Sequence, residues 1–305
     1  CNAKVRKDKM PRRSSKKATG DARNRASPAR LFKLYEFMSE DQKDKIRGVG
    51  FGGLLEFKCD YMPADLSKWL IKDCFDAEKC QLVFPGRGTI SVSGESAHDM
   101  LGLPNPTKGK AVKYEMDCDA IKFIHDKYGV DSGVAPRIKT FVEMLEKNDN
   151  CDDDYLRSWL MIAICTFLCP ATGLGMSPRC YPPVVDVSVV DKLKWCDFVV
   201  DQLVIAKKKM GKRNSVKGCM FFLVILYLDS LEHNLEIPDC EPRIGAWTTK
   251  MMEKVVEMDR KEDGSFGKLK LKQTKHTVID TSMPSCFGDI ERFVSSKAPH
   301  GLSSQ

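Results

Sequence analysis

The sequence predicts a predominantly α-helical α+β fold, with a helical core and a small β-hairpin near residues 81–93. Three observations support this. Apolar residues recur at helical spacing through much of the chain. The runs 155–169 and 216–231 are apolar nearly all round, as in helices buried at a domain centre. Residues 81–84 and 89–93 instead carry β-branched and aromatic side chains and flank four turn residues.

Charge divides the chain into a tail and a folded part. Its 305 residues have a net charge of +7, but the first 30 carry 11 basic and two acidic residues, a net +9, so the other 275 residues sum to −2. Residues 1–28 contain no aromatic residue and are expected to be a disordered basic tail. We expect one helical domain over residues 29–262 and a loosely ordered C-terminal segment over 263–305.

The tail stretch "KVRKDKMPRRSSKK" matches a bipartite nuclear-import signal, the alternative being a solvated tail without that role. The basic residues of the signal are Lys4, Arg6, Lys7, Lys9, Arg12, Arg13, Lys16 and Lys17. The expected partner is a nuclear import receptor, and the expected location is the nucleus. Nucleic-acid contact is expected to be weak, non-specific and due to the tail, because the folded part lacks basic excess.

Local signals set the expected helix boundaries. Order should begin near Pro28, a favourable first-turn residue, and the Ser39–Gln42 stretch is a capping-box pattern for the next helix. A further helix is expected over 63–74. Ser93 should cap a helix that ends at Gly102. Acidic residues 152–154 should sit at the N-terminus of a central helix beginning near Tyr155.

Three expectations concern the C-terminal half. Residues 188–191 should cap a helix whose apolar stripe runs to Leu203, and an all-apolar helix should start at Val216. A last helix should bury the stripe formed by Trp247, Met251, Val255 and Met258. The alternating stretch 268–272, "KLKLK", is expected to form a short exposed strand.

The stretch "PGRG", residues 85–88, could be a phosphate-binding loop or a hairpin turn. A phosphate loop needs a strand, a glycine-rich loop and then a helix, so that backbone N–H groups and the helix dipole meet the anion. Here a second strand follows the loop, and no Gly-Lys-Ser/Thr occurs. We therefore favour a hairpin turn whose glycines permit positive φ, with Arg87 exposed at its tip.

Basic residues also cluster in "KKKMGKR", residues 207–213. Lysines followed by glycine are typical of a helix C-terminus, and an anion-binding patch is the alternative. The candidate patch consists of Arg87, Lys207, Lys208, Lys209, Lys212, Arg213 and Lys217.

The sequence offers no catalytic, metal or cofactor constellation, so we expect a non-enzymatic protein without cofactors. Asp239-Cys240 lacks the following glycine and upstream glutamine of a SUMO-protease site, and no Cys-x-x-Cys pair is present for zinc. A lone His98 fits a structural role better than a ligand role.

Thirteen cysteines without regular spacing indicate reduced thiols, most of them in apolar runs. The apolar run 219–228 is about half of the roughly 20 residues that a membrane span needs.

One modification signal is present. Val112-Lys113-Tyr114-Glu115 fits the apolar-Lys-x-acid pattern read by SUMO conjugation, which makes Lys113 a candidate acceptor. Patterns of four residues also arise by chance.

Three motifs in order resemble a known plant family: "GVGFGGLLEFKCDYMPADLSKWL", "LVFPGRGTISVSGESAHDMLGLP" and "PRIGAWT". They are similar to the plant-mobile-domain-like region of transposon-derived proteins of the grass type, some of which carry a C-terminal SUMO-protease domain. The resemblance spans about residues 49–250. It implies a nuclear interaction module, linked to transposon biology or gene silencing, that binds a protein partner of unknown identity. It carries over no catalytic residue. The alternative is the N-terminal recruiting region of a SUMO-protease-like protein whose catalytic domain lies outside this chain.

Overall fold

The computed structural model describes residues 23–24, 28–131, 133–170, 173, 175–210, 215–216 and 218–280. Its α-helices are α1 (Pro28–Tyr35), α2 (Glu40–Gly48), α3 (Gly52–Leu55), α4 (Ala64–Trp69), α5 (Gly94–Leu101), α6 (Cys118–Tyr128), α7 (Ile138–Glu146), α8 (Asp153–Ala163), α9 (Trp195–Lys208), α10 (Met220–Asp229) and α11 (Thr249–Met258). Shorter π- and 3₁₀-helical turns are η1 (Leu70–Cys74), η2 (Ile164–Leu168), η3 (Pro178–Cys180), η4 (Pro182–Val184), η5 (Val187–Lys192) and η6 (Arg243–Ala246). The strands are β1 (Arg23–Asn24), β2 (Phe75–Asp76), β3 (Gln81–Phe84), β4 (Gly88–Ser91), β5 (Ser215–Val216) and β6 (Thr277–Ile279).

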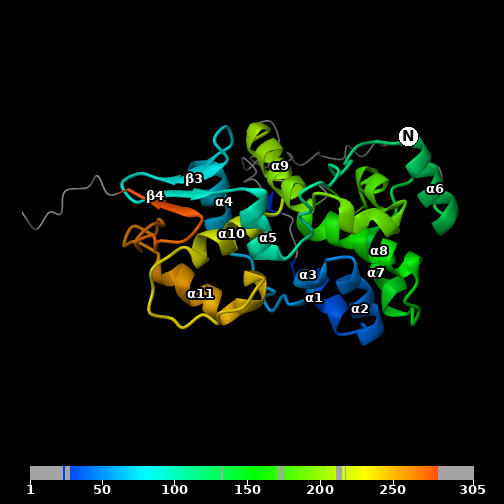
Figure 1. The fold of residues 1–305 in the computed structure, drawn as a ribbon, viewed down its shortest axis with the longest axis horizontal. Helices are drawn as coiled ribbons and strands as arrows, with labels where there is room; N and C mark the ends of the chain where they lie inside the picture. The colour runs from blue at the N-terminus through cyan, green and yellow to red at the C-terminus, as the bar shows by residue number, and fades with distance from the viewer. Residues whose placement is uncertain are drawn as a thin grey trace, which may run out of the picture.

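The predicted helical α+β class is confirmed. Figure 1 shows the strands β3 and β4 at one end of the molecule and α6, α7 and α8 at the other, with α5 and α10 between them. The larger sheet is antiparallel in the order β2-β3-β4-β6, and β1 pairs with β5 in parallel. Within the described residues, no helix is both long enough and apolar enough to cross a membrane.

Helix α10 lies at the centre of the core. Every residue from Met220 to Leu228 is buried, and the helix packs against α4, η1, α5, η6 and α11. Helix α8 is buried along its length as well, and η2 continues it. The Cys169 amide donates to the Ile164 carbonyl oxygen five residues back, and Pro170 has no amide with which to continue the helix. Both predictions of an all-round apolar, buried helix are therefore confirmed.

The predicted helix starts of the first half are also confirmed in detail. Ser39 and Gln42 exchange both bonds of a capping box, and the Asp152 side chain accepts from the Tyr155 amide. Ser93 caps α5, which ends at Gly102 with φ +63°. That left-handed conformation suits glycine, because a Cβ would be strained there.

Two helix starts in the second half were predicted wrongly. Residues 188–191 belong to the 3₁₀ turn η5, capped by Asp186, and α9 begins only at Trp195. The amides of Lys110 and Lys194 bond the carbonyl oxygens of Lys192 and Lys110, which holds the intervening chain extended and delays the helix. Likewise α10 begins at Met220, not Val216, because Gly218 has φ +107°, which no helix admits.

The C-terminal segment differs most from the prediction. Residues 268–272 form no strand; instead β6 joins β4 as the edge of the sheet. Phe266, Leu271 and His276 are buried, and His276 Nε2 lies 2.6 Å from Asp99 Oδ2 on α5. Residues 263–280 therefore pack on the domain and are not loosely ordered. The predicted tail, apart from 23–24 and 28, and residues 281–305 lie outside the described residues.

A buried carboxylate organises this segment. Asp259, fully buried at the end of α11, accepts hydrogen bonds from the Tyr227 hydroxyl at 2.6 Å and from the amides of Gly267 and Leu269 at 3.0 and 2.9 Å. Burial, followed by the Asp259 charge, raises the pKa of Tyr227. The tyrosine therefore stays a hydrogen-bond donor at neutral pH. A buried charge is tolerated only when such donors surround it.

Candidate functional site: a groove where three glycine motifs meet

The three motifs quoted from the sequence meet at one place in the fold. Gly53 of α3 lies against the end of α5 and against the loop before η6. A Cβ on Gly53 would collide with the Leu101 carbonyl oxygen and lie 2.8 Å from Gly102 Cα and 2.9 Å from Pro242 Cγ. Cβ contacts shorter than about 3.0 Å do not occur in folded proteins. The absence of side chains at this junction therefore lets the three segments approach closely.

Two further glycines extend the junction. A Cβ on Gly50, which has φ +80°, would lie 2.9 Å from Pro104 Cγ, and one on Gly245 would lie 3.1 Å from Glu56 Cβ. The first motif thus contacts the second through Gly50 and Gly53, and the third through Gly53 and Glu56. Sequence order alone gave no sign of this contact.

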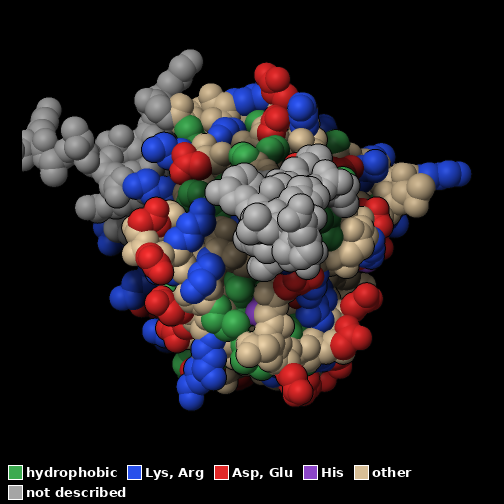
Figure 2. All heavy atoms as spheres, turned by 90° about the vertical axis from the view of Figure 1, so that its left-hand side faces the viewer, with side chains coloured by type: hydrophobic (Ala, Val, Ile, Leu, Met, Phe, Trp, Pro, Cys, Tyr) green, Lys and Arg blue, Asp and Glu red, His purple; other side chains and the backbone are tan. Residues whose placement is uncertain are grey.

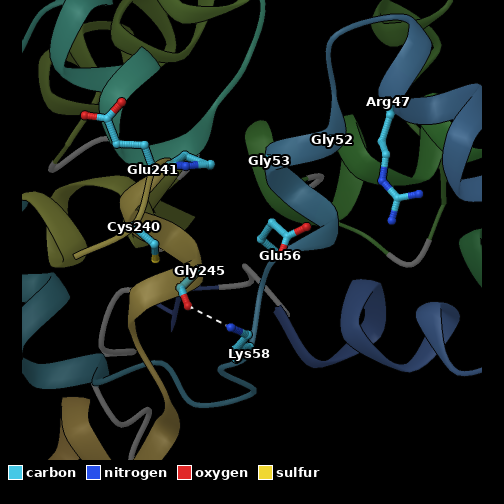
Figure 3. Close-up of a pocket in the computed structure, with 9 residues that line it drawn as sticks. Arg47, Gly52, Gly53, Glu56, Lys58, Cys240, Glu241 and Gly245 are labelled. Atoms are coloured by element: carbon cyan, nitrogen blue, oxygen red, sulfur yellow. Dashed lines mark hydrogen bonds between the residues drawn. The ribbon is translucent and has the colours of Figure 1, made fainter. Parts of the chain in front are cut away.

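A groove of about 330 Å³ opens at this junction (Figure 3). We call it the junction groove, and its lining residues are Arg47, Gly52, Gly53, Glu56, Lys58, Cys240, Glu241, Pro242 and Gly245. Backbone and proline atoms form much of its wall, and its charged side chains have both signs. Glu56, Lys58 and Glu241 are exposed.

Some of the charged side chains of the junction groove make hydrogen bonds or ion pairs within the described part of the protein, and others do not. The Lys58 ammonium donates to the Gly245 carbonyl oxygen at 3.2 Å, which Figure 3 shows as a bridge across the groove. Arg47 pairs with Glu40 and Asp44 on its own helix. The Glu241 carboxylate points away from Lys58 in Figure 3. The groove therefore presents charged side chains of both signs, an arrangement suited to binding polar and charged groups.

Arg87 is placed differently from the prediction of an exposed tip. The hairpin turn itself is confirmed, with positive φ at Gly86 and Gly88. However, the Arg87 guanidinium folds inward, donates to the Tyr227 hydroxyl at 3.3 Å and to the Leu269 carbonyl oxygen, and lies over the Phe84 ring. Glycine at 267 leaves room for it, since a Cβ there would lie 2.9 Å from Nη1. Arg87 therefore joins the Asp259 network and is not a free anion ligand.

The other members of the candidate anion patch lie at or beyond the end of α9. Lys207 and Lys208 occupy the last turn and Lys209 caps it, as predicted for a helix C-terminus. The Lys207 ammonium donates to the Lys72 carbonyl oxygen at 2.6 Å and so ties α9 to η1. Lys208 and Lys209 are exposed. Lys212, Arg213 and Lys217 lie outside the described residues, so the patch stays a prediction.

His98 and the acidic residues 152–154 are engaged in structural contacts. His98 Nδ1 lies 2.7 Å from the Leu103 carbonyl oxygen at the end of its own helix. Asp152 caps α8, Asp153 pairs with Lys45 at 2.9 Å, and Asp154 pairs with Lys127 and Arg157. Within the described part of the chain, no group of three or more His, Cys, Asp or Glu side chains is placed to hold a metal ion.

Of the remaining predicted sites, the structure describes Lys113 but not the import residues. Lys113 is exposed in an irregular segment whose flanking Val112 and Tyr114 pack against the core. The import residues Lys4 to Lys17 lie outside the described residues.

On the face shown in Figure 2, Lys and Arg side chains are interspersed with Asp and Glu, with no single basic patch among the coloured residues. This mixture matches the near-neutral charge of the chain beyond the tail.

A family model matches residues 24–224, about two thirds of the chain. Its description is "Domain of unknown function (DUF8566)". The chain belongs to this family. No curated protein and no solved structure matches this chain. The matched range ends inside α10, so it contains the first two glycine motifs but not the third, nor Asp259.

Replacing Gly53 with alanine tests the junction. We expect Gly53→Ala to lower the free energy of unfolding by about 2 kcal/mol or more, because the new methyl group meets backbone atoms that cannot move aside. Gly48→Ala, in the same motif, is the matched control: it is helical and has no atom within 4 Å of the new Cβ, so it should be neutral or slightly stabilising. Urea denaturation of both variants measures the difference, and equal stabilities would contradict the close packing.

Proposed function

We propose that this chain is a non-enzymatic nuclear interaction module of transposon-derived origin, and that its junction groove binds a protein partner. The observation that carries the proposal is the charged groove lined by the first and third motifs and the residues next to them, beside the junction where all three motifs meet. The motifs are also those that resemble the plant-mobile-domain-like region, which links the proposal to transposon biology or gene silencing.

The groove suits a peptide segment better than a polyanion. Glu56 and Glu241 would repel phosphates, whereas the exposed Lys58 on the same groove can receive an acidic side chain of the same partner. The volume of about 330 Å³ accommodates a few side chains rather than a folded surface. Charges of both signs at an interface favour specificity and fast association, because a partner with the wrong pattern meets like charges.

The basic tail supplies the nuclear part of the proposal. The net charge of +9 on the first 30 residues suits an import receptor and would also give weak, salt-sensitive contact with nucleic acid. The alternative proposal, a recruiting region for a SUMO-protease domain encoded further along the gene, uses the same groove. The full-length coding sequence separates the two proposals, since only the second requires a downstream catalytic domain.

Affinity capture from plant nuclei with a charge-reversed groove tests partner binding. The double variant Glu56→Lys/Glu241→Lys should lose the proteins enriched by the wild-type chain by at least about tenfold, because two partner contacts become repulsive. The double variant Glu78→Lys/Glu146→Lys is the control. It changes the net charge equally at exposed sites on the β2–β3 turn and at the end of α7. If the groove variant captures the same proteins as the control, the groove is not the binding surface.

A fluorescent fusion tests the tail. Replacing Arg12, Arg13, Lys16 and Lys17 with alanine should leave the fusion in the cytoplasm, because the import receptor reads these positive charges. The wild-type fusion should accumulate in the nucleus. Undiminished nuclear accumulation of the variant would show that import does not depend on the tail.

A further inference from the structure

Two buried thiols from different segments touch each other. Cys165 lies in the π-helical turn η2, Cys180 ends the 3₁₀ turn η3, and their Sγ atoms are 3.5 Å apart. Both residues are buried, with 2% and 0% of their surface exposed. Other buried cysteines of the described chain donate to oxygen atoms: Cys196 Sγ to the Leu103 carbonyl oxygen and Cys59 Sγ to the Tyr61 carbonyl oxygen, both at 3.4 Å. The pair therefore calls for its own explanation.

We propose that Cys165 and Cys180 form a reversible disulfide when the chain meets a disulfide oxidant such as oxidised glutathione, and that this bond locks η3 onto η2. This inference does not depend on the proposed function. A disulfide has an S–S distance of about 2.05 Å, so the two sulfur atoms must approach by about 1.5 Å.

The reaction balances as two thiol–disulfide exchanges. The thiolate of one cysteine attacks oxidised glutathione, forms a mixed disulfide and releases one reduced glutathione. The thiolate of the second cysteine then attacks the protein sulfur of that mixed disulfide and releases the second glutathione. Two electrons pass from the protein thiols to the oxidant, and the two thiol protons end on the two glutathione molecules.

The environment of the pair makes the exchange slow. Burial, reinforced by the neighbouring Cys165 thiol, raises the pKa of Cys180, so little thiolate is present at neutral pH. Oxidised glutathione can reach the pair only when the segment opens locally. The chain around Cys180 consists of the short 3₁₀ turns η3 and η4, which have poorer hydrogen-bond geometry than an α-helix and can open without global unfolding.

A neighbouring thiol provides an internal comparison. Cys169 lies one turn beyond Cys165, and its thiol donates to Gln202 Oε1 at 3.4 Å. The exposed Cys118 and Cys151 provide a second comparison, because their thiols are open to solvent. They should form mixed disulfides with glutathione quickly, whereas the buried pair should form an internal disulfide at least about tenfold more slowly.

The test is thiol mapping of the full chain after incubation with oxidised glutathione. Samples are quenched with an alkylating agent in denaturant, digested without reduction and analysed by mass spectrometry. We expect a cross-linked peptide pair joining Cys165 to Cys180 and a rise of about 5–10 °C in the thermal midpoint, because the bond closes a loop of 15 residues. The variant Cys118→Ser/Cys151→Ser should show the same link and the same rise, since its pair is intact.

Two results would overturn the proposal. One is that Cys165 and Cys180 are still alkylated as free thiols after prolonged exposure that has fully modified Cys118. The other is a link from either cysteine to Cys169 in place of the proposed pair. Neither readout requires a variant at the buried positions, so a folding defect cannot obscure the result.

Discussion

The fully buried carboxylate of Asp259 is the constraint on which the C-terminal half of the structure depends. A charge without solvent contact needs several hydrogen-bond donors, and here they come from α10 and from residues 267 and 269. Arg87 adds the hairpin to the same network through Tyr227 and the Leu269 carbonyl oxygen. One carboxylate thus connects the central helix, the last helix, the hairpin and the segment that returns to complete the sheet.

The glycine junction has a similar role on the other side of α5. It depends on the lack of side chains, because Gly53 and Gly102 let backbone approach backbone, and Pro242 closes over both. The family match stops at residue 224, yet Pro242 and Asp259 both lie beyond it. In this chain residues 225–280, which lie beyond the matched range, therefore complete the core. The charged groove exists only because those residues are in place.

Much of the fold could be predicted from the sequence, because local signals and local structure agree there. The Ser39 capping box, the Ser93 and Gly102 ends of α5 and the apolar helices all follow from side chains acting within a few residues. The direction of Arg87 could not be predicted in this way. A hairpin tip is normally solvated, and the partners that draw Arg87 inward lie 140 and 182 positions away. The late start of α9 has the same origin, since residue 110 holds residues 192–194 extended. The groove could not be predicted because its two walls, residues 47–58 and 240–245, are distant in sequence, although their glycines were visible.

Hydrogen exchange at the amides of Gly267 and Leu269 in the full chain tests most directly whether Asp259 organises the C-terminal segment. Both amides donate to the buried carboxylate, so they should exchange as slowly as the amides in the middle of α10. Asp259→Asn should accelerate exchange at both by about 10–100-fold, since one acceptor oxygen becomes an NH2 group that cannot accept and the other becomes a neutral, weaker acceptor, while the amides of α8 keep their protection. Exchange at the rate of an unstructured peptide in the wild-type chain, or no change in the variant, would contradict the account.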